Sequence, residues 1–152
     1  MLDPQRRKLV AVTPPAAIYD DASLTCAIID TLGYDLCEIV LHLGATDIAM
    51  TALKVQESDA SNMANATDIT ATVMGTAAND AGSTSTLPSA TDDNKFFSFL
   101  IDLRGKKRYL QLVATCGNGS AGTYACAWAG LYRGEKMPQT AAEGGLSQRM
   151  VA

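Results

Sequence analysis

The segment from Asn94 to Thr115 constrains the fold of this chain more than any other. Its sequence, NKFFSFLIDLRGKKRYLQLVAT, holds two alternating apolar runs on either side of a five-residue basic segment. Alternation with a period of two is typical of half-buried strands. In the first run one face consists of Phe97, Phe99, Ile101 and Leu103, and in the second run one face consists of Arg108, Leu110, Leu112 and Ala114. Burying each large apolar side chain contributes roughly 1.5–3 kcal/mol, and a slip of one residue would expose the whole face. We therefore predict a long β-hairpin.

The opposite face of this predicted hairpin is also partly apolar, because it carries Phe96, Leu100 and Tyr109. A second apolar face indicates that something covers it. The covering element would be a second sheet, a neighbouring subunit or a larger partner.

Chain length and composition fit one domain. A chain of 152 residues buries about 68–70% of its unfolded surface. No apolar run approaches the roughly 20 residues of a membrane span, and Leu9–Val12 is too short for the apolar part of a secretory signal. We therefore expect synthesis and folding in a cytosol. The four cysteines have no C-x-x-C spacing and are expected to be free thiols in the core: Cys26, Cys37, Cys116 and Cys126.

Basic charge is concentrated in two clusters, although the net charge is −4. Such clusters can neutralise phosphates, but no stacking aromatic residues interleave with the N-terminal one, so we predict no nucleic-acid binding. The clusters are expected to be solvated or to meet an acidic protein surface. They comprise Arg6, Arg7 and Lys8 near the N-terminus, and Arg104, Lys106, Lys107 and Arg108 between the two apolar runs.

The rest of the chain divides into an arm, a β-rich domain and a tail. Residues 1–15 contain Thr13-Pro14-Pro15 and are predicted to form an extended arm. Residues 16–133 hold further strand patterns at 23–30, 35–43, 48–57, 69–74 and 123–133. The long polar connections 58–68 and 76–94 are expected to be binding elements or disordered, and residues 134–152 to form an irregular tail. About seven strands without an amphipathic helix predict an all-β, antiparallel β-sandwich, jelly-roll-like in topology.

No residue pattern points to catalysis. The segment from Gly117 to Gly122 matches G-x-G-x-x-G, the pattern of dinucleotide-binding loops. The residues that follow it alternate like a strand, so no helix dipole would meet a pyrophosphate, and a glycine-rich hairpin loop is favoured. His42 is the only histidine and has no partner at zinc-ligand spacing. We predict a protein that is not an enzyme, with no catalytic residues, no metal and no cofactor.

Three segments of the sequence resemble small structural proteins of tailed-bacteriophage heads. They are IDTLGYD (residues 29–35), ATDIAMTALKVQES (residues 45–58) and NKFFSFLIDLRG (residues 94–105). Within that group the chain resembles the head-decoration, or cement, proteins over about residues 17–133. The resemblance implies a β-rich homotrimer, made in the bacterial host cytoplasm, that binds the major capsid protein on the outer capsid surface of the virion and braces it. It implies no active-site residues, and the four cysteines depart from its pattern.

A brace of this kind needs a rigid domain, extended arms and several weak contacts that add up. The residues predicted to bind partners are the arm cluster Arg6, Arg7 and Lys8, the apolar outer face Phe96, Leu100 and Tyr109, and the basic turn Arg104, Lys106 and Lys107. The arm is expected to lie across a neighbouring subunit or the capsid shell, and the apolar face to lie in the trimer interface.

Two other functions stay open. A tail or baseplate component of the same virion would share the β-sandwich. A carbohydrate-binding module would need exposed aromatic residues on one face, and Tyr124, Trp128 and Tyr132 lie on one face of a predicted strand. Core or subunit packing is the favoured use of these three side chains.

Overall fold

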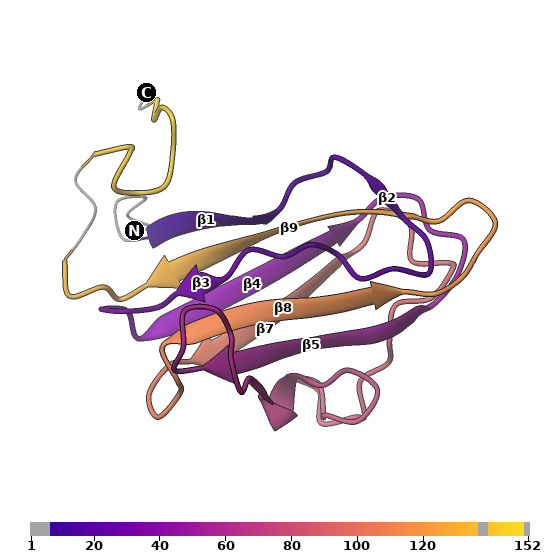
Figure 1. Cartoon of the computed structure of the whole chain (residues 1–152), viewed down its shortest axis with the longest axis horizontal. Helices are drawn as coiled ribbons and strands as arrows, with labels where there is room; N and C mark the ends of the chain where they lie inside the picture. Colours follow the sequence, from indigo (N-terminus) through magenta and orange to yellow (C-terminus); the bar gives the residue numbers. More distant parts are fainter. Residues whose placement is uncertain (1–6, 137–139, 151–152) are drawn as a thin grey trace.

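The computed structural model describes residues 7–136 and 140–150 and is built from two antiparallel sheets packed face to face (Figure 1). Sheet I has the strand order β1-β9-β4-β7, with the short β2 also paired to β9, and sheet II has the order β3-β8-β5-β6. The predicted all-β, antiparallel sandwich is confirmed. The elements are β1 (Arg7–Thr13), β2 (Ile18–Tyr19), β3 (Ile29–Asp30), β4 (Leu36–Leu43), β5 (Met50–Ser58), β6 (Thr67–Asp68), a 3₁₀ turn (Thr70–Thr72), β7 (Phe96–Asp102), β8 (Tyr109–Cys116) and β9 (Thr123–Tyr132).

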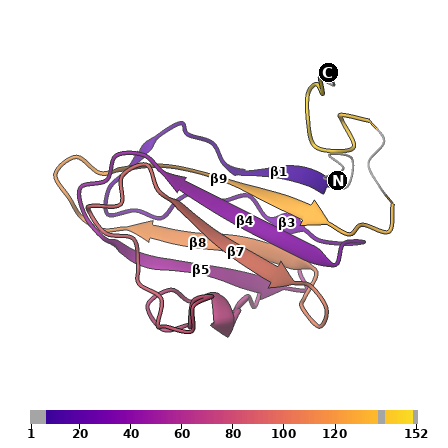
Figure 2. The same ribbon diagram turned by 180° about the vertical axis from the view of Figure 1, so that it is seen from behind.

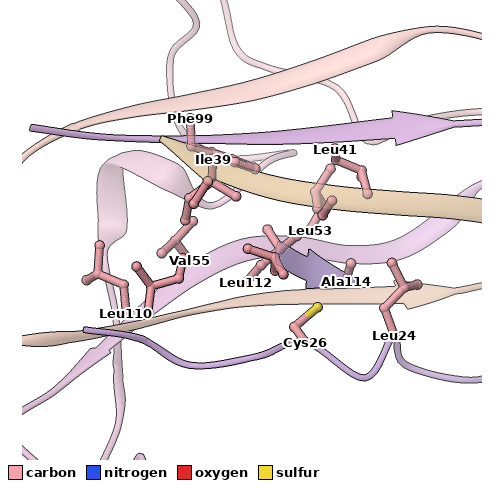
Figure 3. Close-up of a cluster of buried hydrophobic side chains, with 14 of the residues drawn as sticks. Leu24, Cys26, Ile39, Leu41, Leu53, Val55, Phe99, Leu110, Leu112 and Ala114 are labelled. Carbon is pink, nitrogen blue, oxygen red and sulfur yellow. The ribbon is translucent and has the colours of Figure 1, made fainter. Parts of the chain in front are cut away.

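The core lies between the two sheets and is made by alternate residues of each long strand. In Figure 3, Ile39 and Leu41 of β4 point toward Leu53 of β5 and Leu112 of β8, and all four are buried. The inward faces predicted for the two runs between residues 94 and 115 are confirmed, because Phe99 and Leu112 and their buried alternate neighbours face the core. The buried inward side chains of β7 and β8 are Phe99, Ile101, Leu110, Leu112 and Ala114.

The predicted hairpin between residues 94 and 115 is wrong, because its two strands lie in different sheets. β7 pairs with β4, whereas β8 pairs with β3 and β5. The basic segment Arg104–Arg108 therefore crosses from sheet I to sheet II, and Gly105 adopts a left-handed φ of +77° in that turn. Alternation specifies which face of a strand is buried but not which strand lies beside it. Two strands that face one core from opposite sheets show the same pattern as two that are hydrogen-bonded.

The predicted N-terminal arm is wrong for residues 7–13, which form β1 at the edge of sheet I. Arg7 pairs with Tyr132 and Val10 with Ala129, and Val12 is only 2% exposed. Four apolar residues are too few for a signal segment, but they suffice for an edge strand that has one face on the core. The two prolines follow this strand in the connection to β2. Arg6 lies outside the described residues.

The described tail residues, 134–136 and 140–150, contain no helix or strand, but they contact the sandwich. The Leu9 amide donates to the Gly144 carbonyl oxygen at 2.9 Å. Gly145 has a φ of +73°, and a Cβ built there would lie 1.9 Å from the Leu9 carbonyl oxygen. This close approach requires glycine. The tail therefore covers part of the outer edge of β1, and in Figure 1 it rises beside the start of that strand.

Each long connection contains hydrogen bonds of its own: the Ser58 hydroxyl donates to the Ala64 carbonyl oxygen at 2.7 Å in the first, and the Ser85 hydroxyl donates to the Ala77 carbonyl oxygen at 2.7 Å in the second. The Thr72 hydroxyl donates to the Ile69 carbonyl oxygen at 2.8 Å and accepts from the Val55 amide at 3.0 Å, which ties the 3₁₀ turn to β5. The predicted strand 69–74 is replaced by this turn. The predicted strand 23–30 is a strand only at Ile29–Asp30, although Leu24 still donates its amide to Ala114 at 2.8 Å.

We predict that β1 is needed for folding. Val12→Asp would place an unpaired carboxylate in the core and should lower the free energy of unfolding by about 3 kcal/mol or more. Ala11→Asp is the matched control, because Ala11 is exposed on the same strand. Thermal unfolding followed by circular dichroism would compare the two variants. Equal melting temperatures for both would contradict the placement of β1 in the sheet.

Candidate interaction surface

The outward side of sheet I, here called the sheet I face, is rich in apolar and aromatic side chains. Side chains of cross-strand partners lie on the same side of a sheet, so the printed registers give its rows directly. One row joins Phe96, His42 and Cys126, and the next joins Ser98, Val40, Trp128 and Ala11. Further rows contain Leu100, Glu38, Gly130 and Leu9, and then Asp102, Leu36, Tyr132 and Arg7.

Most of the exposed large apolar side chains of the described chain gather on this face. Six such side chains are exposed, and four of them lie here: Phe96 at 65%, Leu100 at 70%, Tyr124 at 51% and Ile18 at 50%. Ile18 belongs to this face because β2 pairs it directly with Tyr124. Sequence reasoning missed Ile18, since a two-residue strand leaves no periodicity to detect. Exposed apolar patches on a protein surface are typical of interaction sites, so this face is the candidate interaction surface.

The outward side of sheet II is polar by contrast. The Lys54 ammonium forms an ion pair with Asp68 at 2.7 Å, and the Gln56 side-chain amide donates to the same carboxylate at 2.8 Å. The hydroxyls of Ser23 and Thr115 are 2.8 Å apart. These side chains satisfy one another, so this face offers few unpaired groups to a partner.

Tyr109 lies on the sheet II side and not beside Phe96 and Leu100, which corrects the predicted single patch. Its neighbour Leu110 points into the core, so Tyr109 points outward from sheet II, where it pairs with Ser58. The Arg108 guanidinium lies 4.9 Å from the centroid of the Tyr109 ring, a cation–π distance. The predicted patch is split because its two strands belong to different sheets.

The three aromatic residues of β9 share one face as predicted, but they lie outside the core. The inward positions of this strand are mostly small, and the buried residues are Thr123, Ala125, Ala127, Ala129 and Leu131. The large side chains of Tyr124 and Trp128 consequently cover the sheet I face. The alternation assigned these residues to the correct faces, but the buried face is the one with small side chains and not the aromatic one.

Side chains of the sheet I face contact one another at two places. The Tyr132 hydroxyl donates to Glu38 Oε2 at 3.1 Å, and a Cβ on Gly130 would lie 2.8 Å from the Tyr132 ring, so the ring lies back over the sheet. Partial burial and then the hydrogen bond to Glu38 raise the pKa of Tyr132. His42 stacks on Phe96 with 4.3 Å between ring centroids and 15° between planes.

The basic turn is partly neutralised within the chain. Arg104 forms an ion pair with Asp102, and Arg108 forms one with Asp30 at 2.7 Å. The hydrogen bond from Arg108 lowers the pKa of Asp30. The Lys107 amide donates to Glu57 at 3.1 Å, and Lys106 is exposed. Two of the predicted partner-binding residues, Arg7 and Lys8, lie on β1. Neither this pair nor the basic turn lies in the apolar patch of Phe96 and Leu100.

The glycine-rich segment from Gly117 to Gly122 connects β8 to β9 and is followed by a strand, as predicted. It is not a hairpin loop, because these strands lie in different sheets. Its amides already donate to carboxylates of the chain: Gly119 to Asp20 at 2.8 Å, and Ser120 and Ala121 to Asp47 at 2.5 Å each. Two carboxylates in this position would repel a phosphate. The hydrogen bonds from the Ala121 and Ser120 amides lower the pKa of Asp47.

Other candidate chemistry is limited in the part of the chain that the structure describes. No group of three His, Cys, Asp or Glu side chains within residues 7–136 and 140–150 could hold a metal ion. No helix in those ranges is both long and apolar enough to cross a membrane. All four cysteines are free thiols, and burial raises the pKa of Cys37 to about 12. A groove of about 510 Å³ lies between β7 and residues 71–85, with Glu38, Ser98 and Leu100 in its wall.

We predict that Asp47 stabilises the fold in a pH-dependent way. The folded state lowers the pKa of Asp47 below its ordinary value of 3.8, so its contribution is present above that value and is lost as the pH falls through the lowered pKa. Asp47→Ala should melt at a lower temperature than the wild type at pH 7, and the gap should close in acid. Asp59→Ala, at an exposed position, is the control. A gap that stays constant between pH 7 and pH 2 would contradict this role.

The chain matches no protein-family model and no curated protein.

Proposed function

We propose that this chain is a decoration protein of a bacteriophage head that binds the outer capsid surface through its sheet I face. The observation that carries the proposal is the contrast between the two outer faces. Sheet I exposes Phe96, Leu100 and Tyr124, whereas sheet II is covered by side chains that bond to one another. A protein that binds with one face and meets water with the other needs this asymmetry.

The order of the strands supports the proposal. Without the short β2 there are eight strands in two sheets, ordered β1-β9-β4-β7 and β3-β8-β5-β6. From β3 to β5 and from β7 to β9, consecutive strands alternate between the sheets. We propose that this arrangement is a jelly roll, an architecture found in viral capsid proteins and in lectins.

The rigidity of the sandwich also suits a brace. β4 and β9 pair over eight consecutive residues in the centre of sheet I, so the outward side chains are held on a stiff backbone. Many copies that each make weak contacts on a capsid lattice gain stability from their high effective concentration. The proposed partner is the major capsid protein, and the proposed location is the outside of the virion.

The test adds the purified protein to isolated heads of the phage that encodes it, prepared without it. We expect saturable binding and a higher temperature of head rupture. Tyr124→Ser should weaken binding by about 10- to 30-fold, because an aromatic hot-spot residue contributes about 2 kcal/mol to an interface. Leu32→Ser is the matched control: Leu32 is 66% exposed but lies in a turn off the sheet I face.

No binding to heads, or equal losses in both variants, would contradict the proposal. Binding to isolated tails but not to heads would favour the tail or baseplate alternative, which the same sandwich could serve.

A second candidate function, carbohydrate binding, is favoured by the aromatic row of β9. Tyr124 is half exposed, and Trp128 and Tyr132 are partly exposed on the same face. Flat aromatic rings that are held against a sheet provide the apolar surface on which a sugar ring can lie. A glycan array, followed by titration of the Trp128 fluorescence, would test it. Saturable binding that Trp128→Ala removes would support this candidate, and an array without hits would exclude it for the sugars displayed.

A further inference from the structure

β7 is an edge strand whose outward backbone groups have no partner within the described chain. On one side it pairs with β4. The Leu43 amide donates to Lys95 at 3.0 Å and the Leu103 amide donates to Asp35 at 2.9 Å, at the two ends of this register. In an antiparallel pair the bonded residues alternate, so the odd-numbered residues of β7 bond to β4. The amides and carbonyls of Phe96, Ser98 and Leu100 therefore point away from the sheet.

The other sheet edges of the described chain are short or covered. The outer side of β1 accepts and donates bonds, since the Leu9 amide donates to Gly144 and the Val12 carbonyl accepts from Ala27 at 2.8 Å. In sheet II, the edge strands β3 and β6 are two residues long each. β7 is seven residues long and receives no such cover. Figure 2 shows it on the near side, with the connection that precedes it looping beside β5.

This edge also lacks the features that usually prevent strands from adding to it. Native edge strands are commonly protected by proline, by lysine or by a bulge. β7 has none of these between Phe96 and Asp102, and its register with β4 is continuous. Beside Ser98 and Leu100, a groove of about 510 Å³ separates this edge from residues 71–85.

We propose that β7 pairs antiparallel with β7 of a second copy of the chain, about a two-fold axis at Ser98. Only even-numbered residues of the two copies can form hydrogen-bonded pairs, because only their backbone amides and carbonyls point away from β4. With the axis at Ser98, Phe96 of each copy lies opposite Leu100 of the other, and Ser98 lies opposite itself. The same register brings Asn94 of one copy opposite Asp102 of the other. The charges near these ends are already paired within each copy, Lys95 with Asp92 and Asp102 with Arg104.

In the register centred on Ser98, apolar residues lie opposite apolar residues, whereas in the neighbouring register they do not. Moving the axis by one residue toward the C-terminus would place Phe96 opposite Asp102 and Ser98 opposite Leu100, which pairs apolar with polar groups twice. The Ser98-centred register buries the two most exposed apolar side chains of β7 against each other. Aromatic–aliphatic cross-strand pairs of this kind stabilise antiparallel sheets.

Pairing through β7 closes at two copies, because a two-fold interface uses the same surface on both subunits. It gives a continuous sheet I that spans both copies and doubles the sheet I face. The inference does not depend on the proposed phage function, and it gives a different subunit number from the homotrimer that the resemblance implies.

Light scattering coupled to size-exclusion chromatography tests the number of copies. We expect a mass about twice the 16.0 kDa of one chain. Leu100→Lys and Ser98→Pro should both reduce it to one chain, the first by placing a charge opposite Phe96 and the second by removing an outward amide that β4 does not use. Leu32→Lys is the matched control, because Leu32 is 66% exposed and lies off β7. A monomeric or trimeric wild type, or a dimer that survives Leu100→Lys, would overturn the proposal.

A cysteine variant tests the register itself. Opposed residues of a bonded antiparallel pair have Cα atoms about 5.5 Å apart, within the range that a disulfide spans. Ser98→Cys should therefore cross-link to a covalent dimer under mild oxidation, whereas Leu32→Cys should not. The wild type gives the background from the four native cysteines. Equal cross-linking of both variants, or none by Ser98→Cys in a dimeric sample, would overturn the Ser98-centred register.

Discussion

The burial of one face of every long strand in a single core is the constraint on which the rest of this structure depends. Ile39 and Leu41 from sheet I meet Leu53 and Leu112 from sheet II. From β3 to β5 and from β7 to β9, strands that follow one another in the chain lie in opposite sheets, so their inward faces contribute to the core from both sides. The connections that result, Arg104–Arg108 and Gly117–Gly122, cross the ends of the sandwich. Each is held by ion pairs or hydrogen bonds to carboxylates of neighbouring segments.

The two outer faces are not constrained by the core, and this is why their difference points to function. Stability requires only that outward side chains tolerate water. The sheet II face meets that requirement with polar groups that bond to one another, such as Lys54 and Asp68. The sheet I face instead carries apolar side chains. On β9, alanines fill most inward positions, whereas Trp128 and Tyr124 point outward. A sandwich of the same core could carry polar residues there, so the apolar face is best explained by a bound partner.

The sheet edges follow a similar division. The tail and the segment before β3 cover β1, and glycine at position 145 allows the tail backbone to approach Leu9 closely. The opposite edge of the same sheet, β7, receives no comparable cover. Residues 71–85 stand apart from it across a groove and do not bond to its middle. One chain therefore protects one edge and leaves the other open, and both the open edge and the apolar sheet I face meet at Phe96 and Leu100.

The sequence by itself determined the all-β class and the buried faces of β7 and β8, because alternation is a local property that each strand carries alone. On β9 it separated the two faces correctly but did not show that the face with small residues is the buried one. It also excluded a dinucleotide loop at Gly117–Gly122, since a strand pattern follows. Only the tertiary structure decided which strands are neighbours. β7 and β8 are separated by a connection short enough for a hairpin, yet they pair with β4 and β5, which are far away in the sequence. Strand pairing depends on such distant contacts, and a period of two is the same for every possible neighbour. For that reason the sequence could identify Phe96, Leu100 and Tyr109 as outward residues, but only the fold separated Tyr109 from the other two and joined them to Tyr124 and Ile18.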